Sequence, residues 1–133
     1  AKKYGIANVA GKNGLVLLPD EFTLPEGLKF TPGLDANDGT KFFAMHTPYT
    51  EEQWIEMQKA GAVFLPVTGS RQPYAEMAYV NEIGKYWSVT CCQKTYFEDC
   101  VYCLTFESSY MSPDDNNNPR DYGRAVRLVH DCE

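Results

Sequence analysis

The chain has 133 residues, of which 44% are hydrophobic and 23% are charged, and its formal net charge is -6 at pH 7. This size and composition indicate one globular domain spanning residues 1–133 and exclude a disordered chain. The acidic balance argues against nucleic acid and anionic membrane as partners, because both are bound through clustered Lys and Arg. No apolar run reaches the roughly 18 to 20 residues that cross a bilayer, so direct membrane insertion is not expected.

The opening third of the chain, through Thr47, is interrupted by many Gly and Pro residues. We therefore predict short elements there, with Leu15–Leu18 as the only buried strand. Residues Asp35–Thr40, which include Asn37, Asp38 and Gly39, predict a surface turn.

A helix is predicted over Glu51–Ala60. Thr50 is placed to cap its amino end, Gln53 completes the reciprocal capping box, and Gly61 supplies the left-handed residue that ends it. Its apolar stripe, which should pack on a sheet, consists of Trp54, Ile55, Met57 and Ala60.

Short extended runs follow the helix, at Ala62–Leu65, Lys85–Thr90, Val101–Glu107 and Arg124–His130. One helix followed by several antiparallel strands predicts an α+β domain. The last run has apolar residues on both sides, so we expect a largely covered strand. Ser108–Arg120 is polar and broken by Pro, which predicts a long exposed loop without regular structure.

The five cysteines are Cys91, Cys92, Cys100, Cys103 and Cys132. Four thiols in thirteen residues could nominally bind zinc, but Cys100 and Cys103 flank a strand-like pair of residues and would face opposite ways. The alternative is a hairpin of small apolar thiols, with at most one cross-strand bridge that joins Cys91 or Cys92 to Cys100 or Cys103. The run from Asp114 to Asn118 lacks the Gly and final Glu of a calcium loop. No metal or other cofactor is expected.

The chain lacks the usual signatures of an enzyme. It has no Gly-x-Ser-x-Gly elbow, phosphate-binding Gly-rich loop or His-Glu-x-x-His motif. Its two histidines, His46 and His130, are expected to have surface or structural roles. We therefore expect a protein that is not an enzyme.

Three stretches carry a resemblance to a known family: GLVLLPDEFTLPEGL from Gly14, YTEEQWIEMQKAGAVFLPVTGSR from Tyr49, and GKYWSVT from Gly84 together with YGRAVRLVHD from Tyr122. With these the chain resembles the major-paralogous-domain family of exported proteins from gut Bacteroidetes. The resemblance implies a C-type-lectin-like fold, with Trp87 and Val126 in the central sheet. It also implies that Arg127 forms a buried or semi-buried ion pair.

The chain departs from the family mainly between Thr90 and Tyr122, where it places aromatic residues, acids and cysteines. Proteins of similar fold are diversified by retroelements that randomise adenines, and altered Asn codons then give Tyr, Cys, Phe, Asp, Ser and His. The alternative is that these are ordinary surface positions of a family member. The candidate ligand-binding residues are Cys91, Cys92, Tyr96, Phe97, Asp99, Cys100, Tyr102, Cys103, Tyr110, Asp121 and Tyr122.

The sequence thus favours a binding domain, of receptor or adhesion type, that displays a variable surface from about residue 90 to 122 to a protein or glycan on another cell or phage. The resemblance implies export to the cell surface, as a lipoprotein or as part of a larger surface protein; a phage virion is the alternative. A second hypothesis is a structural or assembly domain of a cell-envelope or fimbrial protein, which would show a large apolar interface.

Overall fold

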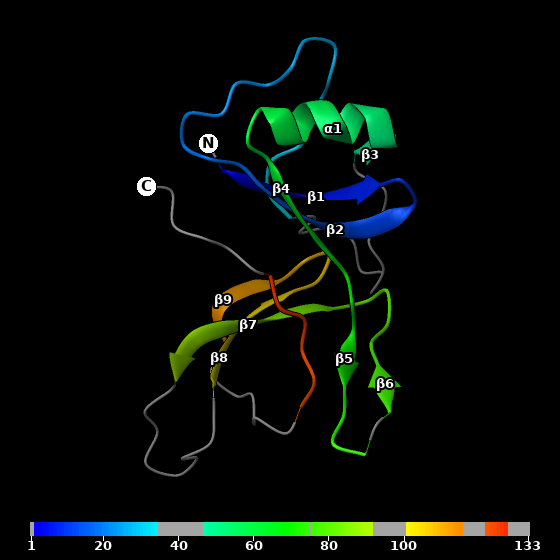
Figure 1. Cartoon of the computed structure of the whole chain (residues 1–133), viewed down its shortest axis with the longest axis vertical. Helices are drawn as coiled ribbons and strands as arrows, with labels where there is room; N and C mark the ends of the chain where they lie inside the picture. Colours follow the sequence, from blue (N-terminus) through cyan, green and yellow to red (C-terminus); the bar gives the residue numbers. More distant parts are fainter. Residues whose placement is uncertain (1, 35–46, 75, 92–100, 116–121, 128–133) are drawn as a thin grey trace.

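The computed structural model describes residues 2–34, 47–74, 76–91, 101–115 and 122–127. These residues form three layers, in which helix α1 (Glu51–Lys59) covers a four-stranded sheet, and a three-stranded sheet packs on the other face of that sheet (Figure 1). The expected α+β class, rich in short strands and with one short helix, is confirmed. The turn expected at Asp35–Thr40, both histidines and Cys132 lie outside the described residues.

The four-stranded sheet has the order β3-β1-β2-β4. Its strands are β1 (Tyr4–Val9), β2 (Lys12–Leu17), β3 (Pro48–Tyr49) and β4 (Val63–Pro66). β2 is antiparallel to both β1 and β4, whereas the short β3 runs parallel to β1. The expected strands at Leu15–Leu18 and Ala62–Leu65 are therefore present as β2 and β4, each with slightly different ends.

Strand β1 corrects the expectation of a single strand in the opening third. Val9 pairs with Lys12, so the hairpin turn consists of Ala10 and Gly11, whose φ angles of 49° and 84° are both positive. Positive φ at both turn positions is the geometry that matches the twist of a tight hairpin. Asn or Asp usually occupies the first of these positions. Because Ala10 stands there, the sequence lacks the usual signature of this turn. The Gly11 N–H donates a 2.9 Å hydrogen bond to Asn8 Oδ1, which fixes the turn.

Helix α1 begins as predicted. The Gln53 N–H donates to Thr50 Oγ1, and the Thr50 N–H donates to Gln53 Oε1, which completes the capping box. Gly61 follows the helix with a φ of 99°, which a residue with a Cβ rarely adopts. Trp54 and Met57 of the predicted stripe are buried as expected, but Ile55 is wrong, because it is 45% exposed. Position 55 lies only one residue after Trp54 and therefore turns away from the sheet.

Both faces of the four-stranded sheet are buried. On the helix side, Val16 packs in a cluster with Trp54 and Met57. On the other side, Leu15 packs in a second cluster with Tyr86 and Phe106 of the three-stranded sheet. A central strand that is covered on both faces explains why β2 carries a continuous apolar run and no alternation.

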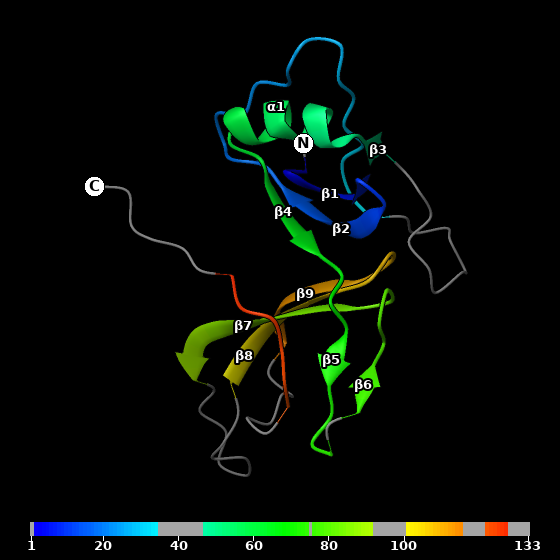
Figure 2. The ribbon, with the colours of Figure 1, turned by 45° about the vertical axis from the view of Figure 1, so that its right-hand side comes forward.

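The three-stranded sheet has the order β7-β8-β9 and is antiparallel throughout. Its strands are β7 (Gly84–Cys91), β8 (Val101–Phe106) and β9 (Met111–Asp115), beside which lie the short strands β5 (Ser70–Arg71) and β6 (Met77–Ala78) (Figure 2). The predicted strands at Lys85–Thr90 and Val101–Glu107 are thus present. Gly84 pairs with Phe106, and Cys91 pairs with Val101.

Strand β9 overturns part of the expectation of a loop over Ser108–Arg120. Met111–Asp115 pairs with β8, and Ser108 is 1% exposed. Pro113 has no N–H to donate, and the two acids that follow it, Asp114 and Asp115, disfavour strands, so the sequence argued against this element. β9 is the edge strand of its sheet, where a proline is tolerated.

The strand expected at Arg124–His130 is not found in its described part, residues 124–127. Ala125 makes an isolated bridge to Tyr86, but Val126 is 63% exposed and Arg127 is also exposed. The implied central-sheet position of Val126 and the implied burial of Arg127 are therefore wrong for this structure. The chain passes along the edge of β7 without forming a continuous ladder; Arg124 and Ala125 are half-buried, whereas Val126 and Arg127 are exposed.

Candidate functional site

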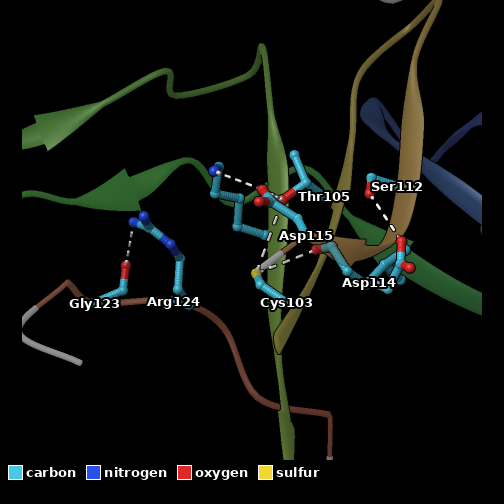
Figure 3. Close-up of polar contacts among 9 residues, drawn as sticks. Cys103, Thr105, Ser112, Asp114, Asp115, Gly123 and Arg124 are labelled. Atoms are coloured by element: carbon cyan, nitrogen blue, oxygen red, sulfur yellow. Dashed lines mark hydrogen bonds and ion pairs between the residues drawn. The ribbon is translucent and has the colours of Figure 1, made fainter. Parts of the chain in front are cut away.

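The outer face of the three-stranded sheet carries a cluster of polar side chains. Alternation along each strand turns Tyr86 and Phe106 toward the core and leaves their neighbours Lys85 and Thr105 on the opposite face. Asp115 at the end of β9 reaches the same face (Figure 3). Three strands therefore contribute one charged or hydroxyl side chain each to a common position.

Asp115 joins these groups. The Thr105 hydroxyl donates a 2.8 Å hydrogen bond to Asp115 Oδ2, and Lys85 Nζ lies 3.5 Å from the same oxygen. The Lys85 and Asp115 side chains are 17% and 22% exposed, so water screens the pair less than it would on an open surface. The cluster fixes the three strands to one another at a half-buried position.

Cys103 lies beneath this cluster. It is completely buried. Its thiol donates a 3.5 Å hydrogen bond to the Leu104 carbonyl, and the Thr105 hydroxyl oxygen lies 3.9 Å from the Cys103 sulfur. Burial raises the pKa of the Cys103 thiol, which favours its neutral form. Cys103 is free, so a cross-strand bridge to Cys103 is ruled out, and this residue is not part of an exposed ligand surface.

Arg124 covers the same face of the sheet from the C-terminal side. Its guanidinium carbon lies 4.7 Å from the centre of the Tyr122 ring and 5.9 Å from the centre of the Trp87 ring, which places the cation over both aromatic faces. Burial lowers the pKa of the Arg124 guanidinium. Arg124 Nη1 also donates a 3.4 Å hydrogen bond to the Gly123 carbonyl (Figure 3).

Backbone hydrogen bonds hold this C-terminal segment in place. Gly123 exchanges two hydrogen bonds of 2.9 Å with Arg71 of β5, and Ala125 exchanges two of 3.0 Å with β7, at Lys85 and Trp87. Residues 123–125 therefore lie between β5 and β7 and connect them. Tyr122, one of the predicted ligand-binding residues, is thereby positioned against the sheet.

The register of the sheet brings several predicted positions to one end. β7 ends at Cys91, which pairs with Val101 at the start of β8, and Cys103 pairs with Asp115 at the end of β9. The described residues that border 92–100 and 116–121, namely Cys91, Val101 and Asp115, therefore all lie at this end. Half-buried Tyr102 belongs to the same end. We name this end, defined by Cys91, Val101, Tyr102 and Asp115, the distal end.

Tyr110 does not share that position. It lies in the turn between β8 and β9, next to the Phe106–Met111 pair, and its side chain is 51% exposed. Phe106 follows Val101 by five residue steps along β8, or about 17 Å at roughly 3.3 Å per step. The surface predicted over residues 90–122 is therefore not continuous in space, because Tyr110 lies at the opposite end of the sheet. The remaining predicted residues lie outside the described residues: Cys92, Tyr96, Phe97, Asp99, Cys100 and Asp121.

Other surface residues were not found by the sequence reasoning. Tyr74, between β5 and β6, is 92% exposed, while Met77, Tyr79 and Val80 are 59%, 51% and 51% exposed. Tyr79 also has a φ of 57°, which is uncommon for a residue with a bulky side chain. The strand signal of this segment is weak, since β5 and β6 have two residues each. The sequence signal that could have indicated it is the concentration of large apolar residues between Tyr74 and Val80.

Within the described part of the chain, no three His, Cys, Asp or Glu side chains gather as a metal site would require. The same residues include no helix long and apolar enough to cross a membrane. Comparisons with protein-family models, curated proteins and solved structures found no match to this chain.

Proposed function

We propose that this domain is a non-enzymatic binding module of receptor or adhesion type, and that its ligand surface lies at the distal end of the three-stranded sheet. The observation that carries the proposal is the register: Cys91 pairs with Val101, and Cys103 pairs with Asp115. The described residues that border most of the predicted variable positions therefore lie at one end of a single sheet. Sequence changes in segments attached in this way leave the core contacts intact.

The scaffold behind this end is firmly held. Phe106 and Cys103 of β8 are completely buried, and the Tyr86 hydroxyl donates a 2.7 Å hydrogen bond to the Pro66 carbonyl of the neighbouring sheet. A fixed platform reduces the entropy that a displayed segment loses on binding. The aromatic residues among the candidates offer large contact areas with few rotatable bonds, which suits a protein or glycan ligand.

A C-type-lectin-like fold, export to the cell surface and diversification by a retroelement belong to the same proposal and rest on the sequence resemblance. The described residues form a mixed fold with one helix and several short antiparallel strands, which is compatible with the fold part of the proposal. The gene neighbourhood tests diversification: an adjacent reverse transcriptase with a near-copy of the 3′ coding sequence is expected. A neighbourhood without either element would contradict diversification but leave the binding module untouched.

Binding is tested with a matched pair of variants. Tyr96, Phe97 and Tyr102 are replaced together by Ala in one variant, and Tyr110→Ala is the control. We expect the triple variant to lose capture of ligand from a glycan array or a panel of surface proteins. We expect Tyr110→Ala to bind like the parent, because the exposed Tyr110 lies at the other end of the sheet. Equal binding by the triple variant and the parent would refute the proposed surface.

A second candidate function, that of an assembly domain of a cell-envelope or fimbrial protein, is favoured by one observation. Gly84 pairs with Phe106, so the turn before β7 and the turn after β8 lie at the same end (Figure 2). That end and the adjoining β6 expose the apolar side chains of Met77, Tyr79, Val80 and Tyr110. An assembly role predicts a stable oligomer through this patch. Light scattering should then show a dimer or larger species that Met77→Lys converts to a monomer.

A further inference from the structure

A cavity of about 400 Å³ lies between the two sheets, away from the outer-face cluster. One wall consists of Leu17, Val63 and Leu65 from β2 and β4. The opposite wall includes Leu104 and Pro113 from β8 and β9. This volume lies in the range of small-molecule sites, which are typically about 300–1,000 Å³ and mostly apolar.

One cation lies at the margin of this apolar space. Arg127 is exposed to solvent and also lines the cavity, so this residue lies where the cavity meets solvent. Of the described residues that line the cavity, Arg127 is the only one with a charged side chain. The cavity therefore combines an apolar interior with a positive rim, although the whole chain carries a net charge of -6.

The positive charge acts on the interior as well as on the rim. Burial raises the pKa of Tyr86, and the charge of Arg127 opposes this rise. Tyr86 also lines the cavity, and its hydroxyl proton is already donated to the Pro66 carbonyl. The cavity wall at Tyr86 is thus close enough to Arg127 to feel its charge. The Tyr86 hydroxyl is not free to donate to a ligand, because it already donates to the Pro66 carbonyl.

We propose that this cavity binds an amphiphile with a single anionic head group and an unbranched aliphatic tail, such as a medium-chain carboxylate. The tail removes the partly exposed apolar surface of Leu17, Val63 and Leu104 from water, which is the main source of affinity. The head group remains at the opening, where Arg127 can bind a carboxylate with two parallel N–H donors. Arg127 would repel a cationic head group at the same place, so the cavity should prefer anionic over cationic amphiphiles.

The chain-length dependence of binding tests the apolar part. Hexanoate, octanoate and decanoate are titrated into the protein by calorimetry, each below its micelle concentration. Each added CH₂ should increase the affinity about fourfold until the cavity is filled. Affinity that does not change with tail length, or no binding of decanoate at millimolar concentration, would overturn the proposal.

The charge is tested separately. Arg127→Gln should reduce the affinity for octanoate about tenfold and leave that for octanol unchanged. Arg71→Gln is the matched control, because Arg71 is also exposed but does not line the cavity. Equal losses in the two Arg variants would show that net charge, and not Arg127, attracts the anion, and the assigned site would then be wrong.

A third variant locates the ligand without relying on charge. Val63→Phe narrows the cavity from the β4 side and should weaken decanoate more than hexanoate, with circular dichroism confirming the fold. If this variant does not fold, perturbation of the Tyr86 ring resonances by octanoate provides the location, since Tyr86 faces the core and lines the cavity. Unperturbed Tyr86 resonances would refute binding there. These outcomes are independent of ligand capture at the distal end.

Discussion

Lys85 and Asp115 belong to strands that are not neighbours, yet Lys85 Nζ lies 3.5 Å from Asp115 Oδ2 across the intervening β8. Thr105 of β8 donates to the same carboxylate oxygen, so the three side chains form a continuous connection across the sheet. β9 reaches this position because the register shifts between its pairings with Cys103 and Thr105. An irregularity in the edge strand therefore creates the polar cluster.

The first prediction concerns this connection. Thr105→Val keeps the volume of the side chain but removes the donor, and we expect it to lower the free energy of unfolding by about 1–2 kcal/mol. Lys85→Met should cost less than about 1 kcal/mol, since the Lys85–Asp115 distance is long for an ion pair. Urea unfolding of the single and double variants measures both effects. Strict additivity in the double variant would show that Asp115 does not couple Lys85 to Thr105.

Local signals explain which parts of the fold could be predicted from the sequence. The helix start depends on Thr50 and Gln53, which are three residues apart, so the capping box is readable without tertiary information. β9 depends on pairing with β8, which overrides the poor strand propensity of Pro113. The same applies to the candidate site. The sequence suggested the segment from 90 to 122, but only the register shows that Tyr110 lies at the opposite end from Cys91.

The second prediction tests the corrected helix face. Met57 is completely buried, whereas Ile55 is 45% exposed. Met57→Ala should therefore lower the free energy of unfolding by about 2–5 kcal/mol, and Ile55→Ala by less than about 1 kcal/mol. Both changes introduce the same residue into the same helix, so helix propensity nearly cancels in the comparison. If the two variants lost equal stability in thermal unfolding, Ile55 would have to be a core residue.

The third prediction concerns alkaline stability. Tyr49 is 4% exposed, and its hydroxyl donates to the Lys29 carbonyl; burial raises its pKa from 10.0 to about 12. Because the folded-state pKa lies above the unfolded one, ionisation favours the unfolded chain. The associated stability is fully present below pH 10 and is lost as the pH rises toward 12, by about 2–3 kcal/mol. Urea unfolding at several pH values measures this loss.

Tyr49→Phe is the control for this effect. It should be less stable than the parent at pH 7 by about 1 kcal/mol, since the Lys29 carbonyl loses its donor. Its stability should then decline less steeply between pH 10 and 12. Parallel declines in the two proteins would assign the alkaline loss to other tyrosines, such as Tyr86, whose pKa is also raised by burial.

The fourth prediction concerns the close approach of β7 and β8. A Cβ at position 84 would overlap the ring of Phe106, which is completely buried. Gly84→Ala should therefore destabilise the fold by about 1–3 kcal/mol through overpacking, although alanine favours folding at an unstrained position. Phe106→Leu supplies the test, because a smaller side chain leaves room for the new methyl group. Gly84→Ala should cost less in that background, and an equal cost would rule out the ring as the cause.

The fifth prediction concerns the reactivity of Cys103. Its thiol is completely buried, free and shifted to a higher pKa, so both access and thiolate content are low in the folded protein. Iodoacetamide at pH 8 should modify Cys103 at least about a hundredfold more slowly in native protein than in urea, because reaction requires local opening of β8. Mass spectrometry of the peptide that contains Cys103 measures both rates and separates it from the other cysteines. Thr105→Val should speed the native reaction, since it weakens the connection to β9 above the thiol. Rapid modification of Cys103 in the native protein would instead show that its thiol is accessible to solvent.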